Sequence, residues 1–114
     1  MQMTRTAAPA SFDKVSGFEA CVGPVARLLK LLASEQRLLL LCRLLEGEAS
    51  VGDLAEHAGL AQSAASQHLG KMRAEGLVAT RREAQTIYYR LDDPGAVQVL
   101  NVLQKLYAPP PEVR

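Results

Sequence analysis

Residues that start or end helices interrupt this chain at short intervals, so it can form only short elements. Serine and aspartate are suited to start a helix, because their side chains accept a hydrogen bond from a free backbone N–H group. Glycine is suited to end one, because it adopts the left-handed backbone conformation at no steric cost. From residue 34 onwards such residues follow one another closely, at Ser34, Gly47, Ser50, Gly59, Gly76 and Asp93.

The segments between these residues show the periodicity of helices and strands. Apolar residues at spacings of three and four predict helices, whereas alternating, β-branched or aromatic runs predict strands. Residues 12–33 are expected to form a helix that is kinked, or divided into two, at Gly23-Pro24. Further helices are expected at 35–45, 51–57, about 62–75 and 94–107, and strands at Leu77–Arg82 and Thr86–Leu91.

The chain is expected to form one domain with two tails. Its 114 residues suit a single domain of ordinary size. Residues 1–10 are small and polar and predict a flexible N-terminal tail, and residues 109–114, which begin with three prolines, predict a C-terminal tail. The domain itself is expected to span residues 11–108.

Composition excludes several classes of protein. No window approaches the roughly 18 uncharged residues that a membrane helix needs, so no membrane partner is expected. The N-terminus lacks a basic-then-apolar signal segment, and the two cysteines are too few for a disulfide scaffold. These observations predict a cytoplasmic protein with reduced thiols.

The order of the elements predicts a mainly α fold with a small β-hairpin. A short helix leads through a glycine turn into a second helix, and a hairpin and a last helix follow. This order is the winged helix-turn-helix plan. In the helix at 62–75, Ala65, Leu69 and Met72 are expected to face the core, where they pack against Leu54 and Leu60.

The opposite face of that helix and the hairpin tip are the candidate surface for binding DNA. Small side chains let a helix approach the floor of the major groove, and serine and glutamine both donate and accept hydrogen bonds there. Residues 62–90 carry five basic and two acidic residues, a net charge of +3, against +1 for the whole chain. The candidate DNA-binding residues are Gln62, Ser63, Ser66, Gln67, Lys71, Arg81, Arg82, Gln85 and Thr86.

Two other classes of function stay open at this point. The small polar face and the arginines also fit an ordinary solvated surface, in which case the domain would be a protein-interaction module that does not bind DNA. An enzyme is the third class. No catalytic set is suggested by spacing and no glycine-rich phosphate loop occurs, so no catalytic residue and no cofactor are expected.

Four segments together resemble the ArsR/SmtB family of bacterial winged-helix repressors. The pattern Gln-Ser-x-x-Ser-x-x-Leu, followed by Gly-Leu-Val and a Tyr-Tyr strand, is the most specific part. The resemblance covers roughly residues 25–107. The segments are Leu28–Leu45 (LLKLLASEQRLLLLCRLL), Val51–Leu60 (VGDLAEHAGL), Gln62–Leu69 (QSAASQHL) and Gly76–Leu91 (GLVATRREAQTIYYRL).

The resemblance implies a homodimer that binds operator DNA and releases it when an inducer acts. The dimer would be built from the first and last helices. The last helix supports this on its own, because Val97, Leu100, Leu103 and Leu106 form an apolar stripe larger than one small domain easily covers. A two-fold dimer would bury this stripe and place two recognition helices about one DNA turn apart.

Metal sensing, which many family members perform, is not expected here. The start of the helix at 51–57 has no thiol, and residues 92–108 contain neither histidine nor cysteine. Asp92 and Asp93 alone make a poor transition-metal site. His57 and His68 lack partners at ligand spacing, and each is expected to be a surface or packing residue.

Cys42 is the candidate sensor. It stands where the resemblance places a sensing cysteine of the persulfide- and redox-responsive branch (BigR-like and SqrR-like repressors), whose inducers would be reactive sulfur species or oxidants. The second cysteine of that branch corresponds to Ala108 here, which leaves Cys21 as the other candidate. Whether Cys21 can link to Cys42 depends on a distance that spacing does not give. The alternatives are a buried structural Cys42 and a regulator with no thiol or metal sensing, either constitutive or controlled by another ligand or partner.

Overall fold

The computed structural model describes residues 17–109, so the predicted tail at 1–10, residues 12–16 of the first helix and residues 110–114 lie outside the described part. The chain divides into two units, one ending at Leu32 and one beginning at Ala33, and each is described by itself. Within residues 17–109 no helix is long and apolar enough to cross a membrane.

Residues 17–32, the described part of the first unit, form two helical stretches, as the Gly23-Pro24 pair predicts. Residues 17–20 are helical, Cys21 lies in a turn, and α2 spans Val22–Leu32. The break comes two residues before the Gly-Pro pair. Pro24 therefore lies in the first turn of α2, where its missing N–H group leaves no helical hydrogen bond unmade.

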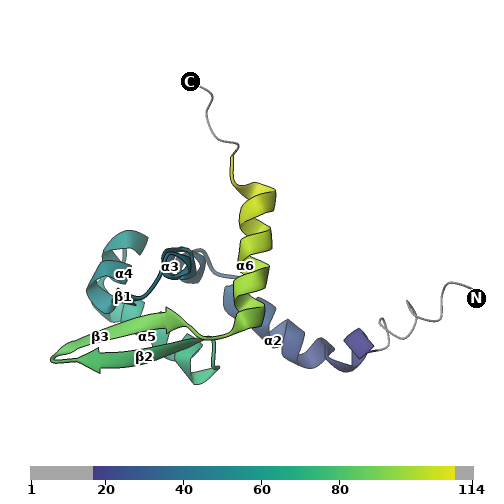
Figure 1. Cartoon of the computed structure of the whole chain (residues 1–114), viewed down its shortest axis with the longest axis horizontal. Coiled ribbons are helices and arrows are strands. Elements are labelled where there is room, and N and C mark those ends of the chain that lie inside the picture. Colours follow the sequence, from purple (N-terminus) through teal and green to yellow (C-terminus); the bar gives the residue numbers. More distant parts are fainter. Residues whose placement is uncertain (1–16, 110–114) are drawn as a thin grey trace, which may run out of the picture. The chain divides into compact units, whose positions relative to one another are not determined.

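The second unit contains four helices and three short strands (Figure 1). In chain order they are α3 (Glu35–Leu45), β1 (Ala49–Ser50), α4 (Val51–Ala58), α5 (Gln62–Ala74), β2 (Val78–Glu83), β3 (Thr86–Leu91) and α6 (Pro94–Tyr107). This is a winged helix-turn-helix, with α4 and α5 as the helix-turn-helix and the β2–β3 hairpin as the wing. The predicted fold class is confirmed.

The predicted helix caps form as expected. The Ser34 hydroxyl accepts from the backbone N–H of Arg37 at 3.3 Å, and the Ser50 hydroxyl accepts from that of Asp53 at 3.1 Å. At α6, the Asp93 carboxylate accepts from the backbone N–H of Gly95 at 2.9 Å. Gly59 ends α4 in the left-handed conformation, with φ at +68°. These local contacts fix where the helices begin and end.

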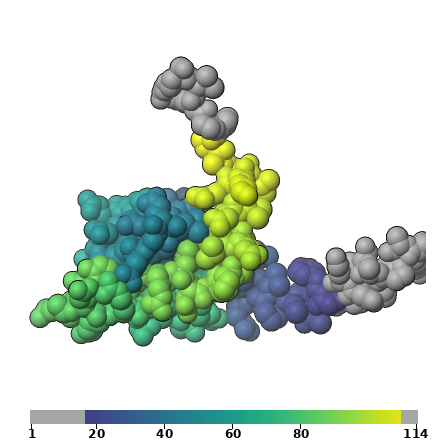
Figure 2. Space-filling model, viewed as in Figure 1, coloured from purple at the N-terminus to yellow at the C-terminus, as the bar shows by residue number. Residues whose placement is uncertain are grey.

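The three strands form one antiparallel sheet in the order β1-β3-β2. The predicted hairpin is confirmed with β2 shifted by one residue, and its tip places Ala84 at a φ of +56°. Sequence reasoning missed β1, in which Ala49 pairs with Tyr89 and Ser50 with Tyr88. Because β1 pairs no further, the wing continues beyond Tyr88 as two strands alone, and in Figure 2 its green tip extends past the neighbouring helices.

Helices α3, α4 and α5 enclose the core of the second unit. Leu40 and Leu41 of α3, Leu54 of α4 and Leu69 and Met72 of α5 are fully inaccessible to solvent. The core is therefore built mainly from the side chains that helical spacing predicts. It fixes α5 by its inner face and leaves the other face outside.

Replacement of Leu54 by alanine should cost about 2–5 kcal/mol in the free energy of unfolding, because it opens a cavity at a fully buried site. Urea unfolding at one fixed protomer concentration measures this change. Glu56→Ala, on the exposed side of the same helix, is the matched control and should change stability by less than about 0.5 kcal/mol. A Leu54→Ala protein as stable as the control would contradict this core.

Candidate nucleic-acid interface

Helix α5 has one face wholly buried and the opposite face wholly exposed. Ala65, Leu69 and Met72 have no solvent-accessible surface, as predicted for the inner face. Leu60, predicted to pack with them, is only half-buried. The predicted α5 candidates are all exposed, namely Gln62, Ser63, Ser66, Gln67 and Lys71. The outer face is thus free for a partner, and its side chains are polar, small or basic.

The N-terminus of α5 carries no side-chain cap. Ala61 stands at the capping position and supplies no hydrogen bond to the first backbone N–H groups of the helix. Such groups attract anions, because their donors are unsatisfied and the helix dipole is positive there. This end of α5 can therefore accept a phosphate as well as a base edge.

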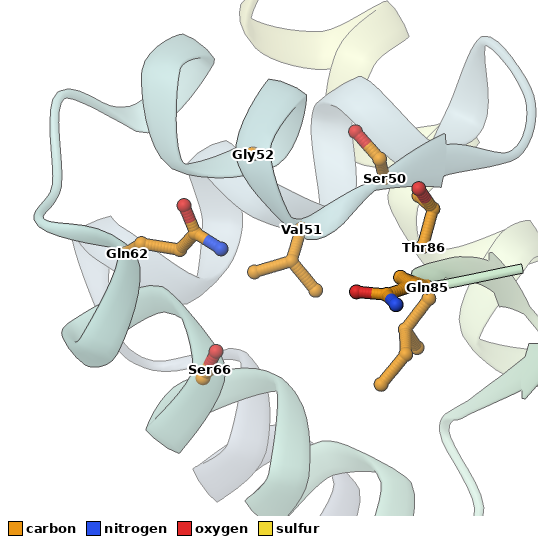
Figure 3. Close-up of a pocket in the computed structure, with 8 residues that line it drawn as sticks. Ser50, Val51, Gly52, Gln62, Ser66, Gln85 and Thr86 are labelled. Carbon is orange, nitrogen blue, oxygen red and sulfur yellow. The ribbon is translucent and has the colours of Figure 1, made fainter. Parts of the chain in front are cut away.

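A surface cleft of about 400 Å³ lies between the start of α4, the start of α5 and the wing. Figure 3 shows Gln62 and Ser66 of α5 on one side, Gln85 and Thr86 of the wing on the other, and Val51 between them. The cleft thus brings together four of the nine predicted residues, which come from two separate segments. Its lining residues are Ser50, Val51, Gly52, Gln62, Ser66, Gln85, Thr86 and Ile87.

Sequence reasoning missed four residues of this cleft: Ser50, Val51, Gly52 and Ile87. Ser50 was predicted only as the cap of α4, which it is, and Ile87 only as a strand residue. The signal that could have placed them is the pairing of β1 with β3, which brings Ser50 opposite Tyr88. Two residues are too few to show that pairing as a pattern in the sequence.

The two predicted wing arginines lie on opposite faces of the hairpin, because neighbouring strand residues alternate. Arg82 pairs across the strands with Ile87, which lines the cleft. Arg81 pairs with Tyr88, on the other face. Both are exposed, but only Arg82 shares the face of the wing on which Ile87 lies.

The guanidinium of Arg81 is bound within the protein. Its Nε donates to both carboxylate oxygens of Glu48 at 2.9 Å, and its Nη1 donates to Glu83 at 2.9 Å. Its Cζ also lies 4.5 Å from the centre of the Tyr88 ring. The hydrogen bonds to Glu48 first, and to Glu83 second, raise the pKa of Arg81 above its ordinary value.

This cluster lowers the positive charge of the wing. Glu48 lies outside the segment 62–90, and the fold adds its negative charge to that segment, so the net charge there falls from +3 to +2. Two carboxylates flank one guanidinium, so the cluster itself is negative. Arg82 and Arg90, which are exposed, remain as the wing's cations outside the cluster.

Cys42 lines a second cavity, between α3 and α6. The cavity has a volume of about 430 Å³, and its lining is almost entirely apolar: Leu38, Cys42, Leu100, Leu103, Gln104, Tyr107 and Ala108. Cys42 is half-buried and is a free thiol. Cys21 is exposed, is also a free thiol and belongs to the other unit. Ala108, the position of the missing second cysteine, thus lines the same cavity as Cys42.

The structure places the two histidines apart from any metal-binding set. Across residues 17–109 no three histidine, cysteine, aspartate or glutamate side chains come close enough to hold a metal ion. His57 is exposed on α4 and His68 is half-buried on α5.

Comparison with known proteins identifies relatives with the same fold. Residues 34–80 match the model of the bacterial regulatory protein family arsR. The chain is similar to the transcriptional activator HlyU of Vibrio cholerae, with 49% identity over 80 residues that cover 70% of this chain and 74% of HlyU.

Two solved structures extend the similarity to most of the chain. The transcriptional repressor BigR from Xylella fastidiosa has a TM-score of 0.79 and 41% identity, over 83% of this chain and 97% of BigR. A homodimeric winged helix-turn-helix DNA-binding domain from Mycobacterium bovis has a TM-score of 0.69 and 33% identity, over 77% of this chain and 82% of that domain.

Proposed function

Because the chain belongs to the arsR family of bacterial regulatory proteins, we propose that it is a homodimeric repressor that binds a specific operator sequence through α5. Its relatives are transcription regulators, not enzymes. The observation that carries the proposal is the outer face of α5, whose side chains are small, polar or basic and exposed, and which is directed outward by a completely buried inner face.

Base recognition is assigned to the middle of the α5 outer face. The Gln67 amide and the Ser66 hydroxyl can donate to and accept from base edges, and the small neighbours of these residues allow close approach to the groove floor. Lys71, one turn further along, is a phosphate contact in this arrangement. Ser63 and the uncapped N-terminus of α5 serve the phosphate at the start of the helix.

The cleft between α5 and the wing is assigned to the DNA backbone. Of its polar groups, Gln62 of α5 and Gln85 and Thr86 of the wing are suited to phosphate and sugar oxygens, and Ser66 belongs to the face that reads the bases. Arg82 adds the positive charge that holds the strand next to the wing. These contacts position the protein, and the α5 face then reads the sequence.

The proposed direction of regulation is repression, as the name of BigR has it. A dimer bound across a promoter excludes other proteins from the same DNA. The name of HlyU is that of an activator, so the names of similar proteins include both directions of regulation.

We assign the dimer interface to the first and last helices. Of the stripe predicted on α6, Leu100 is buried within the chain itself, and only Leu106 is exposed. Val102, Leu106 and Tyr107 are 53%, 68% and 79% exposed, which is unusual for large apolar side chains. A two-fold partner would cover this face and present two copies of α5 to the DNA, as the homodimeric relative from Mycobacterium bovis suggests.

Two variants should distinguish a residue that reads the base sequence from a residue that binds phosphate. Gln67→Ala should cost about 1–3 kcal/mol at the operator but leave non-specific DNA binding unchanged. Lys71→Ala should weaken binding to all sequences and lower the slope of log K against log salt by about 1. Fluorescence anisotropy with an operator selected from random DNA, at several salt concentrations, measures both effects. No DNA binding at low salt would remove the proposed function.

Disruption of the α6 face should break the dimer and weaken DNA binding together. The double variant Leu106→Glu/Tyr107→Glu should sediment as a monomer and bind the operator about a hundredfold more weakly, because one half-site then binds alone. Lys105→Ala, on the same turn of α6, is the control and should stay dimeric. A double variant that remains dimeric would move the interface elsewhere.

We further propose that modification of the Cys42 thiol releases the DNA. In this reaction the sulfur of Cys42 attacks a terminal sulfur of an inorganic hydrogen polysulfide. The thiol of Cys42 becomes a persulfide, and the polysulfide leaves one sulfur shorter, carrying the proton that the thiol has lost. The Cys21 thiol can then attack the Cys42 sulfur and displace the terminal sulfur as hydrogen sulfide, which leaves a Cys42–Cys21 disulfide.

The surroundings of Cys42 give this modification a route to the dimer. Sulfur added in the cavity competes for space with Leu103, Gln104 and Tyr107 of α6, the helix assigned to the dimer. A shift of α6 changes the separation of the two α5 helices, which must remain about 34–36 Å to bind successive half-sites. The second candidate is a regulator without thiol sensing, in which Cys42 only fills the space between the helices.

Polysulfide treatment should lower operator affinity about 5- to 150-fold, the usual range for coupled sites. Cys42→Ser should bind the operator normally and lose this response. Cys21→Ser should keep part of the response, because Cys42 can still form the persulfide. Mass spectrometry of the treated protein identifies the sulfur added to each thiol. A modified Cys42 with unchanged affinity would favour the regulator without thiol sensing.

A further inference from the structure

One side chain of the wing contacts the segment before β1 at the line where the hairpin loses its third strand. The last pair of β1 joins Ser50 to Tyr88, and on the other side of Tyr88 stands Arg81. Beyond this line the hairpin has no neighbouring strand. A two-stranded hairpin on its own is marginally stable, so its direction depends on what fixes it at this line.

The side chain of Arg81 extends across the sheet at this line. Arg81 lies on β2, Tyr88 on the central strand β3, and Glu48 directly before β1. Alternation along the strands places the three residues on one face of the sheet. The guanidinium lies over the Tyr88 ring and reaches Glu48, which it contacts through Nε and Nη2 at 2.9 Å.

The geometry of this contact distinguishes it from an ordinary surface ion pair. A single exposed pair contributes little, but a guanidinium that grips both oxygens of a carboxylate has a fixed direction. Nη1 of Arg81 contacts the Glu83 carboxylate, and the Tyr88 ring lies against the face of the guanidinium and stabilises the cation. The planar fork of arginine is required, because lysine offers one point charge.

We propose that Arg81 is a positioning residue, which sets the angle of the wing through Glu48, and is not a phosphate contact. To contact DNA its guanidinium would have to leave two carboxylates, whereas Arg82 on the other face is free of such contacts among the described interactions. The inference rests on the proposed DNA-binding function. It replaces the sequence-based prediction that Arg81 is a DNA-binding residue.

If Arg81 positions the wing through Glu48, this acidic residue favours DNA binding, although DNA is itself negatively charged. By charge alone, removal of Glu48 should strengthen DNA binding, because it removes a repulsion. If Arg81 and Glu48 position the wing, removal should weaken binding by about two- to fivefold and leave the salt slope unchanged. The sign of the change therefore separates the two accounts.

The experiment compares Glu48→Ala with Glu46→Ala, which removes the same charge two residues earlier without breaking a described side-chain contact. Operator affinity is measured against salt for both, and for Arg81→Lys and Arg81→Gln. We expect Glu48→Ala, Arg81→Lys and Arg81→Gln all to bind about two- to fivefold more weakly with the slope of the unmodified protein. Tighter binding by Glu48→Ala would show that Glu48 acts only by charge repulsion, and a slope lower by about 1 in Arg81→Gln alone would show that Arg81 binds phosphate; either result would overturn the proposal.

Hydrogen exchange of the free protein tests, without DNA, whether the contact of Arg81 with Glu48 positions the wing. Backbone amides at residues 82–87 should exchange about two- to fivefold faster in Glu48→Ala than in Glu46→Ala, because the wing opens more often. Equal exchange in the two variants would overturn the proposal. If exchange rises as expected but no variant, nor the unmodified chain, binds DNA, the proposed function fails and the positioning of the wing stands.

Discussion

The burial of one face of α5 fixes which side chains of this helix face outward. Ala65, Leu69 and Met72 have no solvent-accessible surface, and α5 contacts α3, α4 and β2, so the helix cannot rotate about its axis without exposing these side chains. Burial of the two larger side chains stabilises this orientation by about 1.5–3 kcal/mol each. The polar face is thereby presented outward in one fixed direction, before any partner arrives. A recognition helix needs this property, because its side chains must meet base edges without rearrangement.

Around the candidate interface, less positive charge is left unpaired than the sequence indicates. Of the two adjacent arginines in β2, one is held by Glu48 and Glu83, and the other lies on the face of the wing that borders the cleft. In the proposed interface, positive charge is thus limited to a few positions, which would favour recognition of sequence over general attraction to phosphate. Cys42 lines an apolar cavity beside α6, whereas the cleft lies between α4, α5 and the wing.

Local features of the fold could be predicted from the sequence, and long-range pairing could not. The caps at Ser34, Ser50 and Asp93 and the terminator at Gly59 depend on neighbours within a few residues, and all four are confirmed. Strand β1 has only two residues, and its partner lies much later in the chain, so no periodicity identifies it. The contact of Arg81 with Glu48 spans 33 residues and follows from β1. The candidate α5 residues could be predicted because they lie on one helix face, whereas the cleft depends on the missed strand.

If the outer face of α5 is the surface that meets DNA, the backbone amide NMR signals of the isotopically labelled chain will show where a DNA duplex binds during a titration at low salt. The largest shifts should map to residues 62–71 of α5 and to the wing tip at Gln85 and Thr86. Shifts that leave α5 unchanged and map to another surface, or a spectrum that DNA does not alter, would contradict this assignment.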